Sequence, residues 1–109
     1  MGKYQIKKTS NGQFRWTLKA SNGEVLITSE SYVSKQGCMN GIKSSQGCIE
    51  DKNFDRKTST SGKPYFNQVA NNHQDLGNSQ MYSSEAARDK GIESVKRNAP
   101  EASIEDLTV

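Results

Sequence analysis

The sequence has no long apolar stretch, because its longest uninterrupted apolar run is Val25-Leu26-Ile27. A membrane-spanning helix needs about 20 consecutive apolar residues, so we expect no membrane association. No segment resembling a secretory signal precedes the first strand-like residues either. These absences predict a soluble protein of the cytoplasm.

Thiol and metal ligands are scarce as well. The chain contains two cysteines, Cys38 and Cys48, and one histidine, His73, which are scattered along it. If both cysteines lie on one helix, about 15 Å separates them along its axis, which is beyond the reach of a disulfide. We therefore expect reduced thiols in or near the core, as in cytosolic proteins. So few ligands predict no zinc site, no other metal and no cofactor.

Patterns typical of catalysis are also missing. The sequence contains no glycine-rich phosphate loop, no nucleophile elbow and no carboxylates at metal-ligand spacing. His73 lacks a nucleophile motif, so we interpret it as a turn residue that tolerates unusual backbone angles. Glu24 and Glu30 become Gln74 and Gln80 fifty residues later, which argues against a duplicated carboxylate mechanism. We predict that the protein has no catalytic residues and is not an enzyme.

What the sequence does contain is an internal repeat. Ten residues recur fifty positions later without a gap: Gly12, Ala20, Asn22, Leu26, Ser29, Tyr32, Ser34, Gly41, Ile42 and Ser44. A fixed period of this length indicates a duplicated supersecondary unit. Only 31% of the residues are hydrophobic, so two halves of this size would share one core. We predict a single domain over 1–109, built of repeats 1–50 and 51–100 with a tail at 101–109.

Each repeat shows three strand patterns followed by a helix pattern. The expected strands cover residues 4–9, 13–20, 25–28, 54–59, 64–70 and 75–79. Asn-Gly pairs at 11–12 and 22–23 predict the turns of the first repeat. Helical spacing begins after Ser34 and again at 85–98 after Ser84, and both serines are plausible N-caps.

The tail continues the period, since Ile104 lies fifty residues after Phe54, which lies fifty after Tyr4. Residues 104–108 therefore predict a short closing strand that covers a sheet edge. The complete prediction is an α+β fold in which two pseudo-symmetric β-β-β-α repeats share one antiparallel sheet, with two helices packed on it. Because both units lie in one chain, we expect a monomer.

Three segments carry a family resemblance: residues 14–26, 79–82 and 91–99. Together they resemble the YegP-like family of small bacterial proteins, which has one or two copies of this motif and no established biochemical function. The resemblance covers essentially the whole chain, in the tandem form. It implies an α+β fold in which two units build one sheet and exchange strands. It supplies no catalytic residues.

The second strand of each repeat offers the first candidate site. Arg15 and Lys19 share its solvent face, and the equivalent face of the other repeat carries Tyr65, Asn67 and Val69. Basic residues beside an aromatic ring on an open sheet can bind single-stranded nucleic acid by phosphate contact and stacking. The alternative, which we favour from sequence alone, is a solvated sheet face.

Tyr32 and Tyr82 form the second candidate, because they recur where strand gives way to helix. They could frame a pair of symmetry-related sites in which helix N-termini bind an anion. The favoured alternative is a capped helix start with tyrosine at the edge of the core. Gly41 and Gly91 lie mid-helix, where glycine is unfavourable, and indicate a close approach of the helix to its neighbours.

Charge is distributed unevenly along the chain. Residues 1–50 carry seven Lys/Arg and three Asp/Glu, whereas the net charge of the whole chain is +3. A mildly basic half could meet nucleic acid or an acidic partner, although ordinary solubilising charge is the simpler interpretation. Our leading hypothesis is a non-enzymatic binding or interaction module whose partner the sequence does not identify; a protein and nucleic acid both stay open. The alternatives are weak nucleic-acid binding through the basic sheet face and an enzyme with an unrecognised site.

Overall fold

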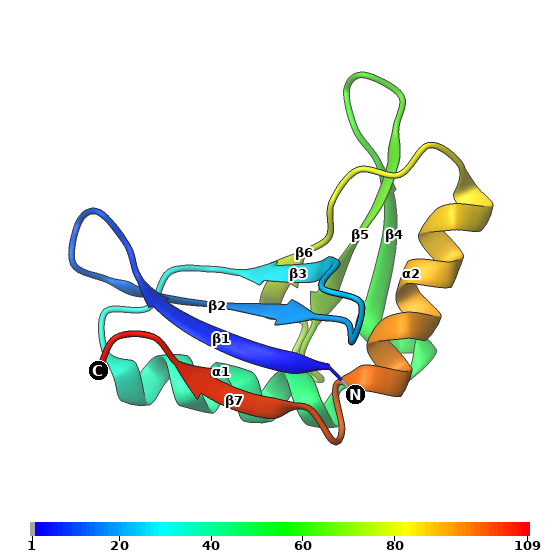
Figure 1. The fold of residues 1–109 in the computed structure, drawn as a ribbon. Coiled ribbons are helices and arrows are strands. Elements are labelled where there is room, and N and C mark those ends of the chain that lie inside the picture. The colour runs from blue at the N-terminus through cyan, green and yellow to red at the C-terminus, as the bar shows by residue number, and fades with distance from the viewer. Residues whose placement is uncertain (1) are drawn as a thin grey trace.

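The computed structural model describes residues 2–109, and over these residues it has seven strands in one sheet and two α-helices (Figure 1). The elements are β1 Lys3–Lys8, β2 Phe14–Lys19, β3 Val25–Ser29, α1 Lys35–Gly47, a 3₁₀ turn η1 Asp51–Asn53, β4 Phe54–Thr58, β5 Pro64–Val69, β6 Asp75–Asn78, α2 Glu85–Asn98 and β7 Ser103–Asp106. The predicted β-β-β-α order of both repeats is therefore confirmed.

The sheet joins the two repeats at its centre, with the strand order β4-β5-β6-β3-β2-β1-β7. Only two residue pairs connect β3 to β6: Thr28 with Asn78, and Ser29 with Gly77. A Cβ atom at Gly77 would lie 2.6 Å from the Thr28 carbonyl oxygen, so glycine permits this close crossing. In Figure 1 the strands of the first repeat run across the view while β4 and β5 run upright.

The tail forms the predicted closing strand, β7, on the outer edge of β1. Tyr4 pairs with Ile104 and Gln5 with Glu105, and the two strands are parallel. The six strands of the two repeats pair antiparallel, as predicted, and the closing strand, whose direction the sequence left open, pairs parallel to β1. The chain leaves α2 beside the start of β1, where the Ser103 N–H donates to the Gly2 carbonyl at 3.3 Å. It then runs alongside β1 in the same direction.

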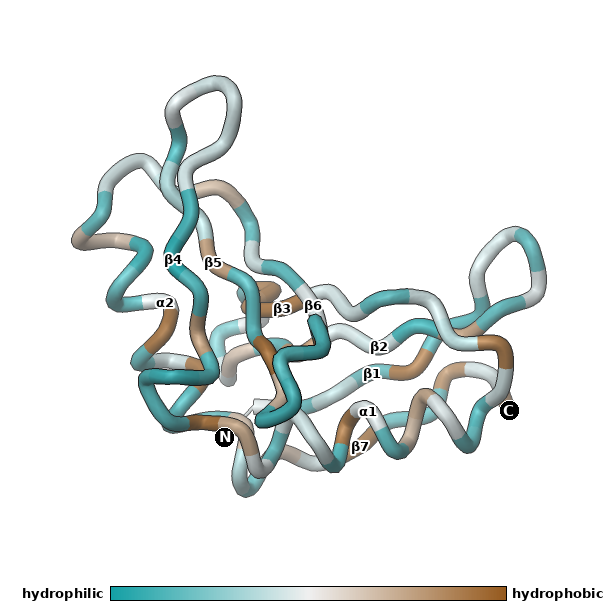
Figure 2. Tube along the Cα trace, turned by 180° about the vertical axis from the view of Figure 1, so that it is seen from behind, coloured by the Kyte–Doolittle hydropathy of each residue, from teal (hydrophilic) through white to brown (hydrophobic). Residues whose placement is uncertain are grey.

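Both helices pack on one face of the sheet, and each helix reaches both repeats. Helix α1 contacts β2 and β6, whereas α2 contacts β5 and β3. The core between them includes Trp16, Leu18, Ile42, Phe66 and Ile92, all fully buried. Figure 2 shows apolar residues interspersed singly or in short groups along an otherwise polar chain. The buried apolar residues of both repeats form one shared core.

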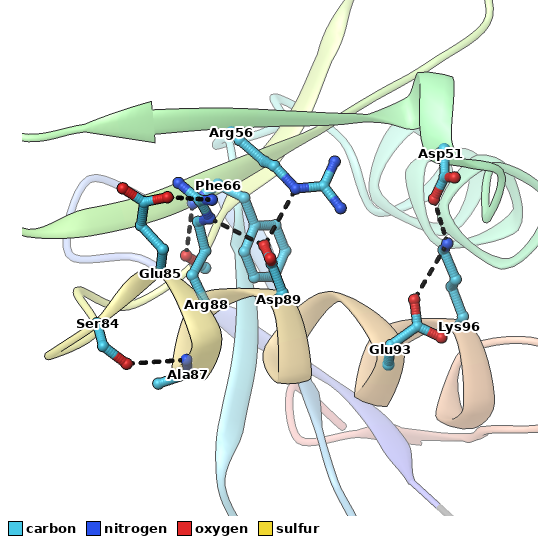
Figure 3. A network of polar contacts seen from close by, with 11 residues as sticks. Asp51, Arg56, Phe66, Ser84, Glu85, Ala87, Arg88, Asp89, Glu93 and Lys96 are labelled. Carbon is cyan, nitrogen blue, oxygen red and sulfur yellow. Dashed lines mark hydrogen bonds and ion pairs between the residues drawn. The ribbon is translucent and has the colours of Figure 1, made fainter.

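Local signals explain where the helices begin. The Ser34 Oγ accepts a hydrogen bond from the Gly37 N–H, and the Ser84 Oγ accepts one from the Ala87 N–H, at 3.0 Å each. Both predicted N-caps are therefore confirmed, and Figure 3 shows the second. His73 has a φ of 68°, which confirms its interpretation as a turn residue.

Ion pairs fasten α2 to the edge of the sheet (Figure 3). Asp89 accepts from Arg56 of β4 at 3.1 Å and from Arg88 at 3.2 Å. Lys96 lies between Glu93 and Asp51 of η1. Exposed pairs of this kind add little stability individually; Arg56–Asp89 joins β4 to α2, and Lys96–Asp51 joins α2 to η1.

Three sequence expectations concern thiols, metals and membranes. Both cysteines are buried and free, and burial raises the pKa of the Cys38 thiol to about 11, so it is protonated at neutral pH. Within residues 2–109, no group of three or more histidine, cysteine or acidic side chains is arranged to hold a metal ion. Neither α-helix in this range is long and apolar enough to cross a membrane.

Asp106 ties the closing strand to α1. Its Oδ1 accepts from the hydroxyl and the backbone N–H of Thr108, at 2.6 and 2.8 Å, and its Oδ2 lies 2.9 Å from the Lys35 Nζ. The Thr108 hydroxyl and then Lys35 lower the pKa of Asp106 from 3.8 to about 2. The ionised carboxylate is therefore the form that stabilises the folded state.

We expect acid to loosen β7 before the rest of the sheet. Because the folded-state pKa lies below the unfolded one, this stabilisation is complete above about pH 4 and is lost as the pH falls towards 2. Heteronuclear NOE values of the β7 amides should fall over this range, while those of β2 stay high. The variant D106N, which loses the ion pair with Lys35, should show lower heteronuclear NOE values in β7 than the wild type at pH 7. A β7 that is equally rigid in D106N would contradict the assignment.

Candidate functional site

The face of the sheet opposite the helices carries a row of polar side chains. Residues in register on adjacent strands point to the same face, and one such series crosses all seven strands. We call it the polar row, and its members in strand order are Asp55, Asn67, Asn78, Thr28, Thr17, Gln5 and Glu105. The row contains no apolar residue, so the centre of this open face is a continuous band of hydroxyl, amide and carboxylate groups.

Three members of the polar row have unused hydrogen-bonding capacity. The Gln5 Oε1, Thr17 Oγ1 and Asn67 Oδ1 atoms are buried and have no hydrogen-bond partner among the described residues. Buried polar atoms in folded proteins nearly always have a partner. These three atoms are therefore positions on the open face whose hydrogen-bonding capacity the fold leaves unused.

Positive charge flanks the polar row in the first repeat. Lys7 pairs with Arg15 across one side of the row, and Lys3 pairs with Lys19 across the other. Lys3 lies 3.6 Å from Glu105. Within residues 2–109, Lys7, Arg15 and Lys19 form no ion pair. Their charges are thus available to an anionic ligand.

The second repeat presents a different surface on the same face. Lys57 pairs with Tyr65 and Asp55 with Asn67, so acidic and basic groups balance there. Tyr65 and Asn67 lie on the open face as predicted, together with Arg15 and Lys19. Val69 does not, because it is only 4% exposed and follows a β-bulge between Gln68 and Val69. The basic character of the open face is therefore confined to the first repeat.

A hollow of about 360 Å³ adjoins the basic part of the open face. It lies beside the β1–β2 turn, and Lys7, Lys8 and Arg15 line it together with Ser31. The Arg15 Nη2 donates to the Ser31 Oγ at 3.1 Å, which orients the guanidinium group. This hollow extends the basic surface towards the turn.

Tyr32 and Tyr82 lie on the other side of the sheet, against the helices. A Cβ atom at Gly41 would lie 2.2 Å from the Tyr32 hydroxyl, and one at Gly91 would lie 2.3 Å from the Tyr82 hydroxyl. The two glycines thus permit the close approach that we predicted. The hydroxyl groups lie against the middle of each helix, while Ser34 and Ser84 cap the helix starts. This agrees with the favoured interpretation of a capped helix start with tyrosine at the edge of the core, and an anion site at the helix starts stays a hypothesis.

Each tyrosine lines a cavity between the helix of its own repeat and the second turn of the other repeat. The cavity beside Tyr82 has about 350 Å³ and includes Asn22 and Glu24, whereas the one beside Tyr32 has about 170 Å³ and includes Gln74. Residues of both cavities are related by the fifty-residue period. Sequence reasoning missed the contribution of the other repeat, because it depends on how α1 and α2 cross the sheet.

The fold and the paired repeats define a class of small tandem α+β proteins with one shared sheet. The family described as "Domain of unknown function (DUF1508)" matches the chain twice, at residues 9–52 and 59–106. The chain belongs to this family, and the YegP-like resemblance is confirmed.

Relatives match over nearly the whole chain. A UPF0339 protein from Shewanella oneidensis is 52% identical over 109 residues, which are 98% of each chain. UPF0339 protein YegP from Escherichia coli (strain K12) is 43% identical over 108 residues, again 98% of each. These names state no activity.

Two solution NMR structures share the fold. A UPF0339 protein from Shewanella oneidensis matches with a TM-score of 0.91 at 50% identity, covering 97% of this chain and 91% of that one. The yegP protein from E. coli, described as a protein of unknown function, matches with a TM-score of 0.92 at 42% identity, covering 97% and 92%. The predicted α+β architecture is therefore shown by relatives as well as by this chain.

Proposed function

We propose that the protein is a non-enzymatic binding module whose open sheet face binds single-stranded nucleic acid. The observation that carries this proposal is the polar row with its three unpartnered oxygens, flanked by the unpaired cations Lys7, Arg15 and Lys19. Amide and hydroxyl groups can accept and donate hydrogen bonds at base edges, while lysine and arginine neutralise phosphates. One face therefore offers both kinds of contact that such a ligand needs.

The dimensions of the open face also suit an extended chain. Neighbouring strands lie about 4.8 Å apart, so a row across seven strands spans roughly 29 Å. Tyr65 supplies one ring for stacking on this face, next to Asn67. With a single ring and few cations, the affinity should be weak and strongly dependent on salt.

Carboxylate chemistry supports a non-enzymatic role. Catalytic acids commonly have a raised pKa. Among the described residues, the carboxyl groups with a resolved shift are Asp51, Asp89, Glu105 and Asp106, and their pKa values are all lowered, chiefly by hydrogen bonds from neighbouring side chains. We further propose a monomer that acts in the cytoplasm, because the two repeats already share one core and both cysteines are free thiols.

An NMR titration with a random single-stranded RNA of about ten nucleotides tests the proposal. At low salt, amide shifts should concentrate around Arg15, Thr17, Lys19, Tyr65 and Asn67, and they should weaken at physiological salt. The variant R15Q/K19Q should weaken binding by about tenfold or more and reduce the salt slope by about 1.4, at about 0.7 per phosphate contact.

The matched control removes two charges outside the open face. K43Q/K52Q alters two exposed lysines that form no ion pair within the described residues, so it should change binding far less. If both variants lose the same amount of RNA affinity, the interaction depends only on net charge, and the proposed surface is refuted. Absence of shifts at low salt, or stronger shifts with an acidic peptide than with RNA, would also refute it.

A further inference from the structure

The cavity beside Tyr82 has the features of a second binding site, on the helix side of the sheet. It has a volume of about 350 Å³ and lies between α2 and the β2–β3 turn. Its polar lining consists of Asn22, Glu24, Tyr82, Lys90, Ser94 and Arg97. The two sides come from different repeats, so the cavity exists only in the assembled fold.

The floor of this cavity holds an unpartnered hydroxyl group. Tyr82 is 8% exposed, and its hydroxyl oxygen has no hydrogen-bond partner in the described part of the chain. It lies against Gly91, which also lines the cavity. Burial raises the pKa of Tyr82, and the nearby Gln80 side chain opposes part of that rise. The hydroxyl is therefore protonated at neutral pH and can donate a hydrogen bond.

Two cations lie on α2 at the rim. Lys90 and Arg97 are exposed and form no ion pair with any residue from 2 to 109. They are separated by about 10 Å along the helix axis, and Ser94 lies between them in the sequence. Glu24 faces them from the β2–β3 turn, where its Oε2 accepts from the Gln80 Nε2 at 2.7 Å. The net charge of the lining is positive.

The first repeat provides an internal comparison. Its equivalent cavity keeps the tyrosine, the glycine and the serine, as Tyr32, Gly41 and Ser44. It has Asn40 where the second repeat has Lys90, and Gly47 stands at the position of Arg97. The same scaffold therefore carries cations in one repeat and none in the other, so the charge is specific to the Tyr82 cavity.

We infer that the Tyr82 cavity binds a small molecule bearing an oxyanion, that is, a carboxylate or a phosphate group. Lys90 and Arg97 neutralise the anion, and the hydroxyl groups of Tyr82 and Ser94 donate hydrogen bonds to it. Glu24 accepts a hydrogen bond from a hydroxyl or ammonium group elsewhere on the same ligand. This site is separate from the open face and does not depend on nucleic-acid binding.

Titration with inorganic phosphate and with acetate, at constant ionic strength made up with chloride, tests the inference by amide NMR. We expect saturable shifts at Gly91, Ser94 and residues 22–24 with at least one of the two anions, and the stronger binder identifies the group. Tyr82→Phe should weaken binding about tenfold, the range of one hydrogen bond to a charged group. Tyr32→Phe, at the matched position, should leave it unchanged.

Two further variants separate binding from folding. Lys90→Asn installs the residue that the first repeat carries at Asn40, and it should weaken binding at least tenfold without changing the fold. Glu24→Gln removes a negative charge and should tighten the binding of plain phosphate. Shifts that never saturate, or that are equal at Gly41 and Gly91, would overturn the inference. Equal losses in Tyr32→Phe and Tyr82→Phe would do so too.

Discussion

The free energy of unfolding of the variant Q68L is expected to be about 2–6 kcal/mol lower than that of the wild type, because two buried carbonyls are left unsatisfied at about 1–3 kcal/mol each. Gln68 is fully buried on β5. Its Nε2 donates to the carbonyl oxygens of Ser45 and Cys48 at 3.0 and 2.9 Å. Leucine has nearly the same size but no donor.

Gln68 substitutes for the donors that the end of α1 lacks. The last carbonyls of a helix have no partner within it, and α1 has no basic residue in its last turn. The Gln68 Oε1 also accepts from the Ser45 Oγ at 2.7 Å, and that hydroxyl lies 2.8 Å from the Tyr4 hydroxyl. One amide thus completes a buried network between β1, α1 and β5.

The other half of the core fills the equivalent positions with apolar residues. Phe54 takes the place of Tyr4, Val95 that of Ser45, and Leu18 that of Gln68, each at an offset of fifty residues. All three apolar residues belong to the same core cluster. All three polar positions of this network are thus apolar in the other half of the core. This agrees with the rule that a buried polar network is stable when complete and costly when one member is missing.

Urea unfolding of Q68L, S45V and the double variant S45V/Q68L measures the coupling. The free energy of unfolding should fall by less in the double variant than the sum of the two single decreases. The double variant contains no Ser45 hydroxyl that has lost its partner Gln68, so that cost is not counted twice. Q36L alters an exposed glutamine of α1 and serves as the control, with a change expected within about 0.5 kcal/mol. If Q68L is as stable as Q36L, the network does not stabilise the fold.

The variant G91A should lose about 1–3 kcal/mol of stability, as expected for overpacking. Alanine favours a helix over glycine by up to about 1 kcal/mol, so propensity alone predicts the opposite sign. A Cβ at Gly91 would lie 2.3 Å from the Tyr82 hydroxyl oxygen and 2.7 Å from its Cζ. The clash therefore decides the outcome.

A matched substitution in the other helix isolates the clash. G47A adds a Cβ that meets nothing within 4 Å, so it should be neutral or stabilising by up to about 1 kcal/mol. Removing the hydroxyl in G91A/Y82F should restore only part of the loss, because the ring carbon stays too close. Thermal unfolding of the three variants provides the comparison, and a G91A protein as stable as G47A would disprove the packing argument.

Sequence patterns located most of the elements because their causes are local. Alternation of apolar and polar residues predicted β2, the Asn22-Gly23 pair predicted a turn, and Ser34 and Ser84 predicted the helix starts. The predicted boundaries lie within one or two residues of those in the structure. These signals depend on neighbours a few positions apart, so the chain order alone reveals them.

Features that depend on the register between repeats were not accessible in this way. The polar row depends on two pairs between β3 and β6, and no single strand shows it. Gln68 belongs by alternation to the core face, yet only the packing of α1 reveals which carbonyls it serves. The cavity beside Tyr82 likewise needs the β2–β3 turn to meet α2. Arg15, Lys19, Tyr65 and Asn67 were predictable because their faces follow from alternation alone.

The pairing of β7 with β1 has a consequence for how the protein folds during synthesis. The contact between Gln5 and Glu105 joins residues 100 positions apart. At synthesis rates of about 5–20 residues per second, β1 emerges from the ribosome roughly 5–20 s before the strand that covers it. During that interval its outer edge is open to other nascent chains. Lys3, Lys7 and Lys8, three cations within six residues, would then repel a second copy of the same strand until β7 arrives.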